Sequence, residues 1–166
     1  MMPPDKDEGN YTDLARYRLE ASERDIADAK VLLDIGSYNN SASRSYYAVF
    51  HAISAIHALD KNAYKRHKDT IGNFNKDYIN NGVFPREYGK KTIKAEKLRH
   101  NSDYGNFYVT TQEDAQEQLD FAIEFCDKVK WSNGKSYYAG EGKDNSRIIQ
   151  PQHWKNKEDS CSASTN

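Results

Sequence analysis

Apolar residues recur at steps of three and four along most of the chain, which is the spacing of an α-helix with one buried face. The first such segment begins after Thr12 or Asp13 and stops at Gly36, a residue type typical of helix C-termini. A polar turn at 37–40 leads into a second helix that runs to about Leu59. Because the turn is short, we expect the two helices to pack antiparallel.

Three more helices are indicated further along the chain. A third extends from about His67 to Asn80, and a fourth starts near Pro85, which suits a first helical turn, and stops at Gly105. The last helix opens with two candidate capping boxes, in which a threonine is followed three residues later by an acid. These pairs are Thr110–Glu113 and Thr111–Asp114.

No segment shows the alternation of a β-strand, so the sequence predicts an all-α, up-and-down bundle of four to five helices. Residues 1–10 are expected to be a flexible N-terminus and residues 11–131 the helical domain. Residues 132–166 are rich in Gly, Ser, Asn and Lys without periodicity, which predicts a mostly disordered C-terminal tail. The alternative is that apolar residues of this tail dock on the domain or on a partner.

The composition limits the cellular location and the cofactors that we expect for this protein. No stretch approaches the roughly 20 apolar residues that cross a bilayer, so we expect no membrane association. Cys126 lies in a helical segment and Cys161 in the polar tail, and two such cysteines make neither a disulfide framework nor a metal-ligand set. The sequence therefore predicts a cytoplasmic protein with no metal site and no cofactor.

Charge is unevenly distributed, although the formal net charge is −1. Residues 61–100 contain eleven Lys or Arg and four acidic residues, whereas residues 111–130 contain two Lys and six acidic residues. The basic segment points to an anionic partner such as RNA. The alternative is that the basic and acidic segments face each other within the fold.

On the second predicted helix, Arg44, Tyr47 and His51 fall on one side. An arginine, a phenol and an imidazole together are suited to contact RNA or a nucleotide. The alternative is a buried polar brace, with Arg44 bonded to an acid and His51 bonded to a backbone carbonyl.

A second polar group stands at the end of the fourth predicted helix. Arg99 and Asp103 are four residues apart, which permits an ordinary helical ion pair. Ser102 and Tyr104 lie beside them, with His100 one step around the helix. The alternative to a simple ion pair is a phosphate site, because a guanidinium fork binds phosphate through two parallel hydrogen bonds.

Several segments resemble the HEPN family in order along the chain. Residues 41–52, SASRSYYAVFHA, match a second-helix signature in which small residues and an arginine precede Tyr-Tyr-Ala and Phe-His-Ala. Residues 32–38, LLDIGSY, fit the turn before it. The other matches are His67–Lys68, Leu98–Arg99 leading to Asp103–Tyr104–Gly105, and the threonine-initiated acidic last helix. The resemblance covers about residues 14–130.

The resemblance implies a helical bundle that commonly forms homodimers and is often encoded with a minimal nucleotidyltransferase as a toxin–antitoxin pair. Many members are metal-independent endoribonucleases, in which an arginine and a later histidine of each subunit meet across a symmetric dimer. The ribose 2′-hydroxyl attacks the adjacent phosphate, the arginine stabilises charge and the histidine moves protons.

This chain lacks a histidine where that motif has one. The three positions at which it is expected, five to seven after Arg99, hold Tyr104, Gly105 and Asn106. The histidines that could replace it are His100, His51 and His67.

Two functions therefore stand side by side. The first is an RNA-binding toxin that cleaves RNA without a metal. Its assigned catalytic residues are Arg99, His100, Asp103 and Tyr104, and its RNA or nucleotide contacts are Arg44, Tyr47, His51, His67, Lys68 and Ser102. The second is a non-catalytic helical partner of a nucleotidyltransferase. A third reading is that Tyr104 accepts nucleotidyl groups from such a partner.

Overall fold

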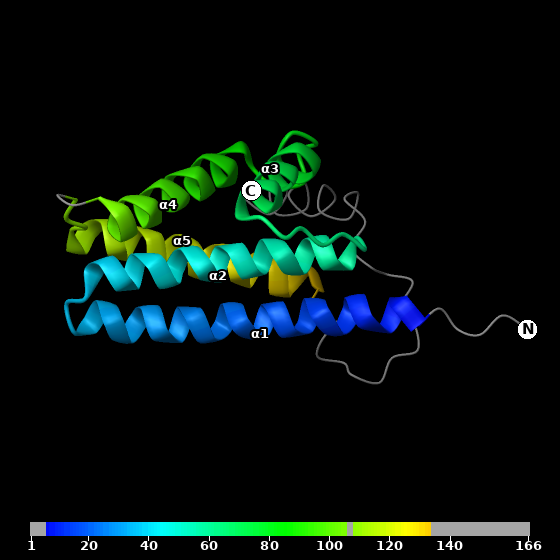
Figure 1. Ribbon diagram of the computed structural model, residues 1–166, viewed down its shortest axis with the longest axis horizontal. Coiled ribbons are helices and arrows are strands. Elements are labelled where there is room, and N and C mark those ends of the chain that lie inside the picture. Colours follow the sequence, from blue (N-terminus) through cyan, green and yellow to red (C-terminus); the bar gives the residue numbers. More distant parts are fainter. Residues whose placement is uncertain (1–5, 106–107, 134–166) are drawn as a thin grey trace, which may run out of the picture.

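Five α-helices and one π-helical turn make up the regular structure of this computed structural model, which describes residues 6–105 and 108–133 (Figure 1). In chain order they are α1 (Lys6–Asp34), α2 (Tyr38–Leu59), α3 (His67–Phe74), the π-turn η1 (Asn75–Ile79), α4 (Arg86–Tyr104) and α5 (Gln112–Asn133). The described residues contain no strand, so the predicted all-α bundle is confirmed. Residues 134–166, most of the predicted tail, lie outside the described residues.

The turn between α1 and α2 forms where the sequence indicated it. Gly36 has a φ of 78°, which suits a residue without a Cβ atom. Its N–H donates to Leu33 O at 3.0 Å, and the N–H of Ser37 donates to Leu32 O at 2.8 Å, so the last carbonyls of α1 are satisfied. The start of α1 differs from the prediction, since the helix begins at Lys6 and not after Thr12. The apolar spacing marks only the part of a helix that packs, whereas polar residues extend α1 beyond it.

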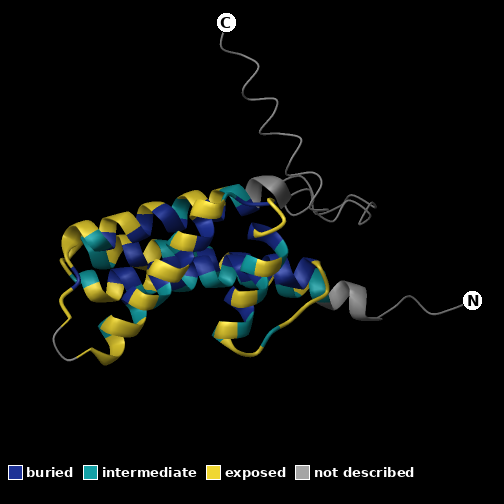
Figure 2. Ribbon diagram, turned by 90° about the horizontal axis from the view of Figure 1, so that it is seen from above, coloured by how far each residue is buried: buried dark blue, intermediate teal, exposed yellow. Residues whose placement is uncertain are grey.

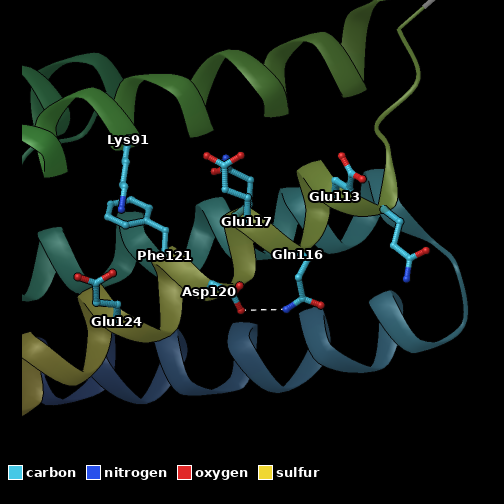
Figure 3. A pocket seen from close by; sticks show the side chains of 9 residues that line it. Lys91, Glu113, Gln116, Glu117, Asp120, Phe121 and Glu124 are labelled. Carbon is cyan, nitrogen blue, oxygen red and sulfur yellow. Dashed lines mark hydrogen bonds between the residues drawn. The ribbon is translucent and has the colours of Figure 1, made fainter.

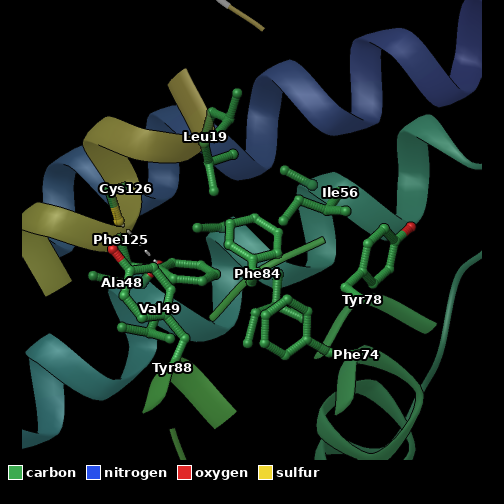
Figure 4. Close-up of a cluster of buried hydrophobic side chains, with 14 of the residues drawn as sticks. Leu19, Ala48, Val49, Ile56, Phe74, Tyr78, Phe84, Tyr88, Phe125 and Cys126 are labelled. Carbon is green, nitrogen blue, oxygen red and sulfur yellow. Dashed lines mark hydrogen bonds between the residues drawn. The ribbon is translucent and has the colours of Figure 1, made fainter. Parts of the chain in front are cut away.

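Helix α2 is the centre of the bundle, because it contacts α1, α3, α4 and α5. Figure 2 shows the buried residues of the helices turned toward the interior and the exposed ones turned outward. The core around α2 is rich in aromatic rings (Figure 4). The rings of Phe74, Phe84 and Phe125 are fully or almost fully buried, with centres 5.5 to 5.7 Å apart. Packed aromatic pairs of this kind add to the stabilisation that burial gives.

The predicted third helix is interrupted. Its last part is the π-turn η1, in which the N–H of Asn80 donates to Asn75 O at 2.9 Å. Helix α4 passes close to this turn at Gly89. A Cβ atom on Gly89 would lie 2.8 Å from Asn75 Oδ1 and 3.3 Å from Ile79 Cγ2, so the close approach depends on glycine.

The second of the two candidate capping boxes starts α5. The N–H of Asp114 donates to Thr111 Oγ1 and the N–H of Thr111 donates to Asp114 Oδ2, both at 3.1 Å. Thr110 has another role, because its N–H donates to Asn39 Oδ1 and its hydroxyl lies 3.0 Å from Ser102 Oγ. It therefore connects the start of α2, the end of α4 and the approach to α5.

Within the described ranges, no helix is both long and apolar enough to cross a lipid bilayer. Cys126 is buried, and its Sγ lies 2.7 Å from Ser22 Oγ across the α1–α5 contact. Cys161, the second cysteine of the sequence, lies outside the described residues.

Candidate functional site

Arg99 of α4 places its guanidinium against two tyrosine rings of α2. Its Cζ atom is 5.1 Å from the ring centre of Tyr46 and 5.9 Å from that of Tyr47. Its Nη1 donates to Asp103 Oδ2 at 3.2 Å, one turn further along α4. The Arg99 side chain remains 17% exposed. The charge is therefore held in a fixed orientation and still reaches solvent, as binding of a phosphate requires.

A carboxylate on α1 joins two of the predicted residues of α2. Asp25 Oδ1 accepts a hydrogen bond from Arg44 Nη1 at 3.1 Å, and Asp25 Oδ2 lies 2.7 Å from His51 Nδ1. The Asp25 side chain is only 8% exposed. The polar brace that the sequence left open therefore exists, but the partner of His51 is this carboxylate and not a backbone carbonyl.

Asp25 is the site residue that the sequence analysis missed. A signal was present, because Asp25 lies three residues after Ser22 and four before Ala29, and all three are on one face of α1. Ser22 and Ala29 are fully buried. An acid on such a face needs a cationic or hydrogen-bonding partner from another helix.

His67, at the start of α3, reaches the same region from a third helix. Its Nδ1 lies 3.0 Å from Tyr46 Oη, and its ring stacks on Phe50 with centres 4.0 Å apart. Burial lowers the pKa of His67 below its usual 6.5, and the positive charge of Arg99 lowers it further, against an opposing effect of Glu96. Burial also raises the pKa of the Tyr46 hydroxyl well above its ordinary value. At neutral pH, the imidazole of His67 is therefore uncharged and the phenol of Tyr46 keeps its proton.

Five of the predicted residues thus come together from three helices, and we call this group the seam: Arg44, Tyr47, His51, His67 and Arg99. Three residues of the seam, Tyr47, His51 and His67, line a cavity of about 280 Å³, and neither Arg44 nor Arg99 is part of that lining. Aromatic rings and cationic side chains are prominent in the lining of this cavity, which includes Arg18, Tyr47, Phe50, His51, Tyr64, Lys65 and His67. Stacking surfaces next to positive charge are typical of sites that hold single-stranded nucleic acid.

The remaining predicted residues lie outside the seam. The ring of His100 contacts the ring of Tyr104, with centres 5.0 Å apart, and Tyr104 is 72% exposed. Ser102 binds Thr110 and so joins α4 to the start of α5. Lys68 is exposed on α3. Proximity of His100 to Arg99 in sequence does not bring the two side chains together, because neighbouring helical residues point about 100° apart.

The acidic helix α5 faces α4 across a groove of about 660 Å³ (Figure 3). Lys94 of α4 spans to Glu117 of α5, with Nζ 2.8 Å from Oε1, and the hydroxyl of Tyr88 donates to Glu124 at 2.6 Å. Part of the basic segment therefore does face the acidic segment, as one of the two alternatives expected. The seam contributes positive charge at a separate place, between α2, α3 and α4.

Among the described residues, no three side chains of His, Cys, Asp or Glu are grouped so that they could hold a metal ion. The seam offers guanidinium and imidazole groups and an aromatic face, and the buried carboxylate of Asp25 binds two of its members.

The fold and the seam together define a class of small helical-bundle proteins with an arginine-centred polar group. The HEPN domain profile matches residues 15–132, and the chain belongs to the HEPN family.

Among its relatives is a Methanocaldococcus jannaschii protein named "Putative toxin MJ0605", which is 32% identical over 113 residues, covering 68% of this chain and 83% of that protein. The crystal structure of TT1696 from Thermus thermophilus superposes with a TM-score of 0.61 at 19% identity, covering 70% of this chain and 96% of the other. That of ST0689, described as an archaeal HEPN homologue, gives 0.57 at 18% identity, covering 70% and 95%. These two structures agree with the bundle fold.

Proposed function

We propose that this protein binds RNA at the seam and cleaves it without a metal ion, as the toxin of a toxin–antitoxin or defence system in the cytoplasm. The observation that supports this most is the placement of Arg99. Its guanidinium is fixed by two rings and by Asp103, and its charge acts on His67 of α3. Cleavage by a 2′-hydroxyl needs charge stabilisation on the phosphate and a group that moves a proton.

Arg99 would bind the phosphate that is attacked. Asp103 accepts a hydrogen bond from Nη1 of Arg99, so the N–H groups of Nη2 can donate to a phosphate oxygen. Asp103 itself orients the arginine. The exposed rings of His100 and Tyr104 lie at the same end of α4 and offer a stacking surface for a neighbouring base.

The toxin role is supported by the name of the Methanocaldococcus relative. The partners are supported by the family resemblance. A homodimer is proposed, with a nucleotidyltransferase as the antitoxin. The dimer is supported by the family resemblance. The exposed apolar side chains near the end of α4, Tyr104, Tyr108 and Val109, are available for such a contact.

The test is cleavage of single-stranded RNA by the purified full-length protein in the presence of a metal chelator. We expect products with a 2′,3′-cyclic phosphate and a 5′-hydroxyl. Arg99→Ala should reduce the rate by about 10² or more, because it removes the main stabiliser of developing charge. Arg99→Lys should recover only part of the rate, since an ammonium keeps the charge but not the fork.

Arg16→Ala is the matched control, because Arg16 is a half-exposed arginine of α1 whose ion-pair partner is Asp13. Its rate should equal that of the wild type. Equal cleavage by Arg99→Ala, or no cleavage of any RNA by the wild type, would contradict the ribonuclease function.

A non-catalytic role as a nucleotidyltransferase partner is the second candidate. It is favoured by the absence of a histidine at the motif positions after Arg99 and by the high exposure of Tyr104. In this case the protein should bind RNA or the nucleotidyltransferase without cutting RNA, and Arg99→Ala should abolish that binding. Transfer of a nucleotidyl group to Tyr104 would appear as a mass increase that Tyr104→Phe prevents.

A further inference from the structure

We propose that His51 is the general base of the seam and His67 a hydrogen-bond donor to the phosphate, with His51 Nε2 accepting the proton of the RNA 2′-hydroxyl and His67 Nε2–H donating to a phosphate oxygen. This inference rests on the proposed ribonuclease function. It assigns the proton transfer to a histidine on α2, far in sequence from Arg99, and gives Asp25 and Tyr46 the task of fixing the two rings.

The hydrogen bond to Asp25 determines which nitrogen of His51 is free. A carboxylate can only accept, so the Nδ1 of His51, 2.7 Å from Asp25 Oδ2, carries the proton. The neutral ring then has its lone pair on Nε2. Asp25 is itself held by Arg44 at 3.1 Å. When Nε2 takes up a proton, the nearby carboxylate stabilises the imidazolium that forms, as in other Asp–His pairs.

The hydrogen bond to Tyr46 gives His67 the opposite arrangement. Tyr46 is 1% exposed, and its hydroxyl lies 3.0 Å from Nδ1 of His67. A buried O–H must donate, so it donates to Nδ1 and the neutral ring carries its proton on Nε2. The lowered pKa of His67 agrees with an uncharged ring. Phe50, stacked at 4.0 Å, holds the ring plane.

The two rings share one environment. Both line the same cavity, and both contact the ring of Tyr47, at 6.3 Å for His51 and 5.9 Å for His67. The charged groups that act on His67 are Arg99 and Glu96 of α4, and His51 of α2 is its titratable neighbour. Those beside His51 are Asp25 of α1 and Arg44 of α2. His51 and His67 therefore line one cavity together, and the charge of Arg99 acts on His67.

The reaction balances with these groups. The 2′-hydroxyl proton passes to His51 Nε2, and the 2′-oxygen forms a bond to phosphorus. The bond from phosphorus to the 5′-oxygen breaks, and that oxygen takes a proton from solvent water. His67 keeps its proton and, with Arg99, stabilises the charge on the phosphate oxygens. His51 then releases its proton to solvent. The products are a cyclic phosphate and a 5′-hydroxyl.

The first test compares RNA cleavage by His51→Ala with and without added bases. Loss of a positioned general base should slow cleavage about 10²–10⁴-fold. Imidazole should restore part of the rate, whereas pyrazole, a ring of the same shape but a much weaker base, should not. Equal rescue by both would indicate that the ring only fills space, and this would overturn the proposal. So would full activity of His51→Ala, or cleavage that depends on His100 and not on His51.

The second test needs no activity. Nitrogen NMR of the two histidines, recorded where the rings are neutral, should show the proton of His51 on Nδ1 and that of His67 on Nε2. In Tyr46→Phe the preference of His67 should weaken while His51 is unchanged. The same tautomer in both wild-type rings would overturn the proposal.

The two proposals fail in different ways. A wild-type protein that cleaves RNA through Arg99, while His51→Ala cleaves equally well, rejects only the histidine assignment. A wild-type protein that binds RNA and cleaves none rejects the ribonuclease function and the proton transfer with it.

Discussion

Asp25 Oδ2 and His51 Nδ1 lie 2.7 Å apart although the two residues are 26 positions apart in the sequence. The same carboxylate binds Arg44, so a single buried acid of α1 fixes two side chains of α2. This relationship ties the stability of the α1–α2 pair to the geometry of the seam.

Asp25→Ala should therefore destabilise the fold. It leaves His51 and Arg44 without their common partner, which we expect to lower the free energy of unfolding by about 1–3 kcal/mol. Asp28→Ala is the control, because Asp28 is exposed on the same helix, and its effect should be within about 0.5 kcal/mol. Urea denaturation at neutral pH measures both. Equal effects of the two substitutions would show that the shared carboxylate contributes nothing to stability.

Stability should also fall in mild acid because of His57. This residue is 1% exposed, and burial lowers its pKa below 6.5, against opposing effects of its hydrogen bond to Thr70 O and of Asp77. The unfolded chain then binds a proton more readily than the folded chain. The contribution of the uncharged His57 to the free energy of unfolding is complete above pH 6.5. It is lost as the pH falls through the lower pKa of His57 in the folded state.

His57→Gln tests this directly, since glutamine can still donate to Thr70 O but does not titrate in this range. The difference in unfolding free energy between pH 8 and pH 5 should be smaller in the variant than in the wild type. An identical difference in the two proteins would contradict a lowered pKa of His57.

Two glycines of the α3–α4 region should respond in opposite ways to alanine. Gly89→Ala should destabilise the protein, because its Cβ would meet Asn75 Oδ1 at 2.8 Å and Ile79 Cγ2 at 3.3 Å. Gly72 is exposed in α3 and has open space at the Cβ position. Gly72→Ala should therefore raise the free energy of unfolding by about 0.5–1 kcal/mol. Thermal melts of both variants measure the signs, and a stabilising Gly89→Ala would show that α4 does not need this close approach.

Truncation after Asn133, the end of α5, should leave the proposed homodimer intact. The segment that remains contains all five helices and the seam. Light scattering at micromolar concentration should give twice the monomer mass for the truncated chain and for the full-length chain. A monomeric truncated chain beside a dimeric full-length chain would assign the interface to residues 134–166, and two monomers would contradict a composite site between subunits.

The sequence by itself determined the helices, because each depends on local features. The three- and four-residue apolar spacing, Gly36 with its positive φ, and the reciprocal bonds of Thr111 and Asp114 all act within one or two turns. The same local rule explains why Arg44, Tyr47 and His51 share a face. The HEPN resemblance rested on sequence motifs, above all residues 32–38 and 41–52, and is confirmed by the match over residues 15–132.

The tertiary structure determined which residues each of these side chains contacts. The contacts of Asp25 with Arg44 and His51, and of His67 with Tyr46, join residues 19 to 26 positions apart on different helices. The π-turn after Phe74 likewise lies against α4, where the Cβ position of Gly89 is 2.8 Å from Asn75 Oδ1. The spacing of residues along one helix determines the direction in which each side chain points around the axis of that helix. It does not fix the axial offset and rotation between two helices, which depend on how all the core side chains pack together.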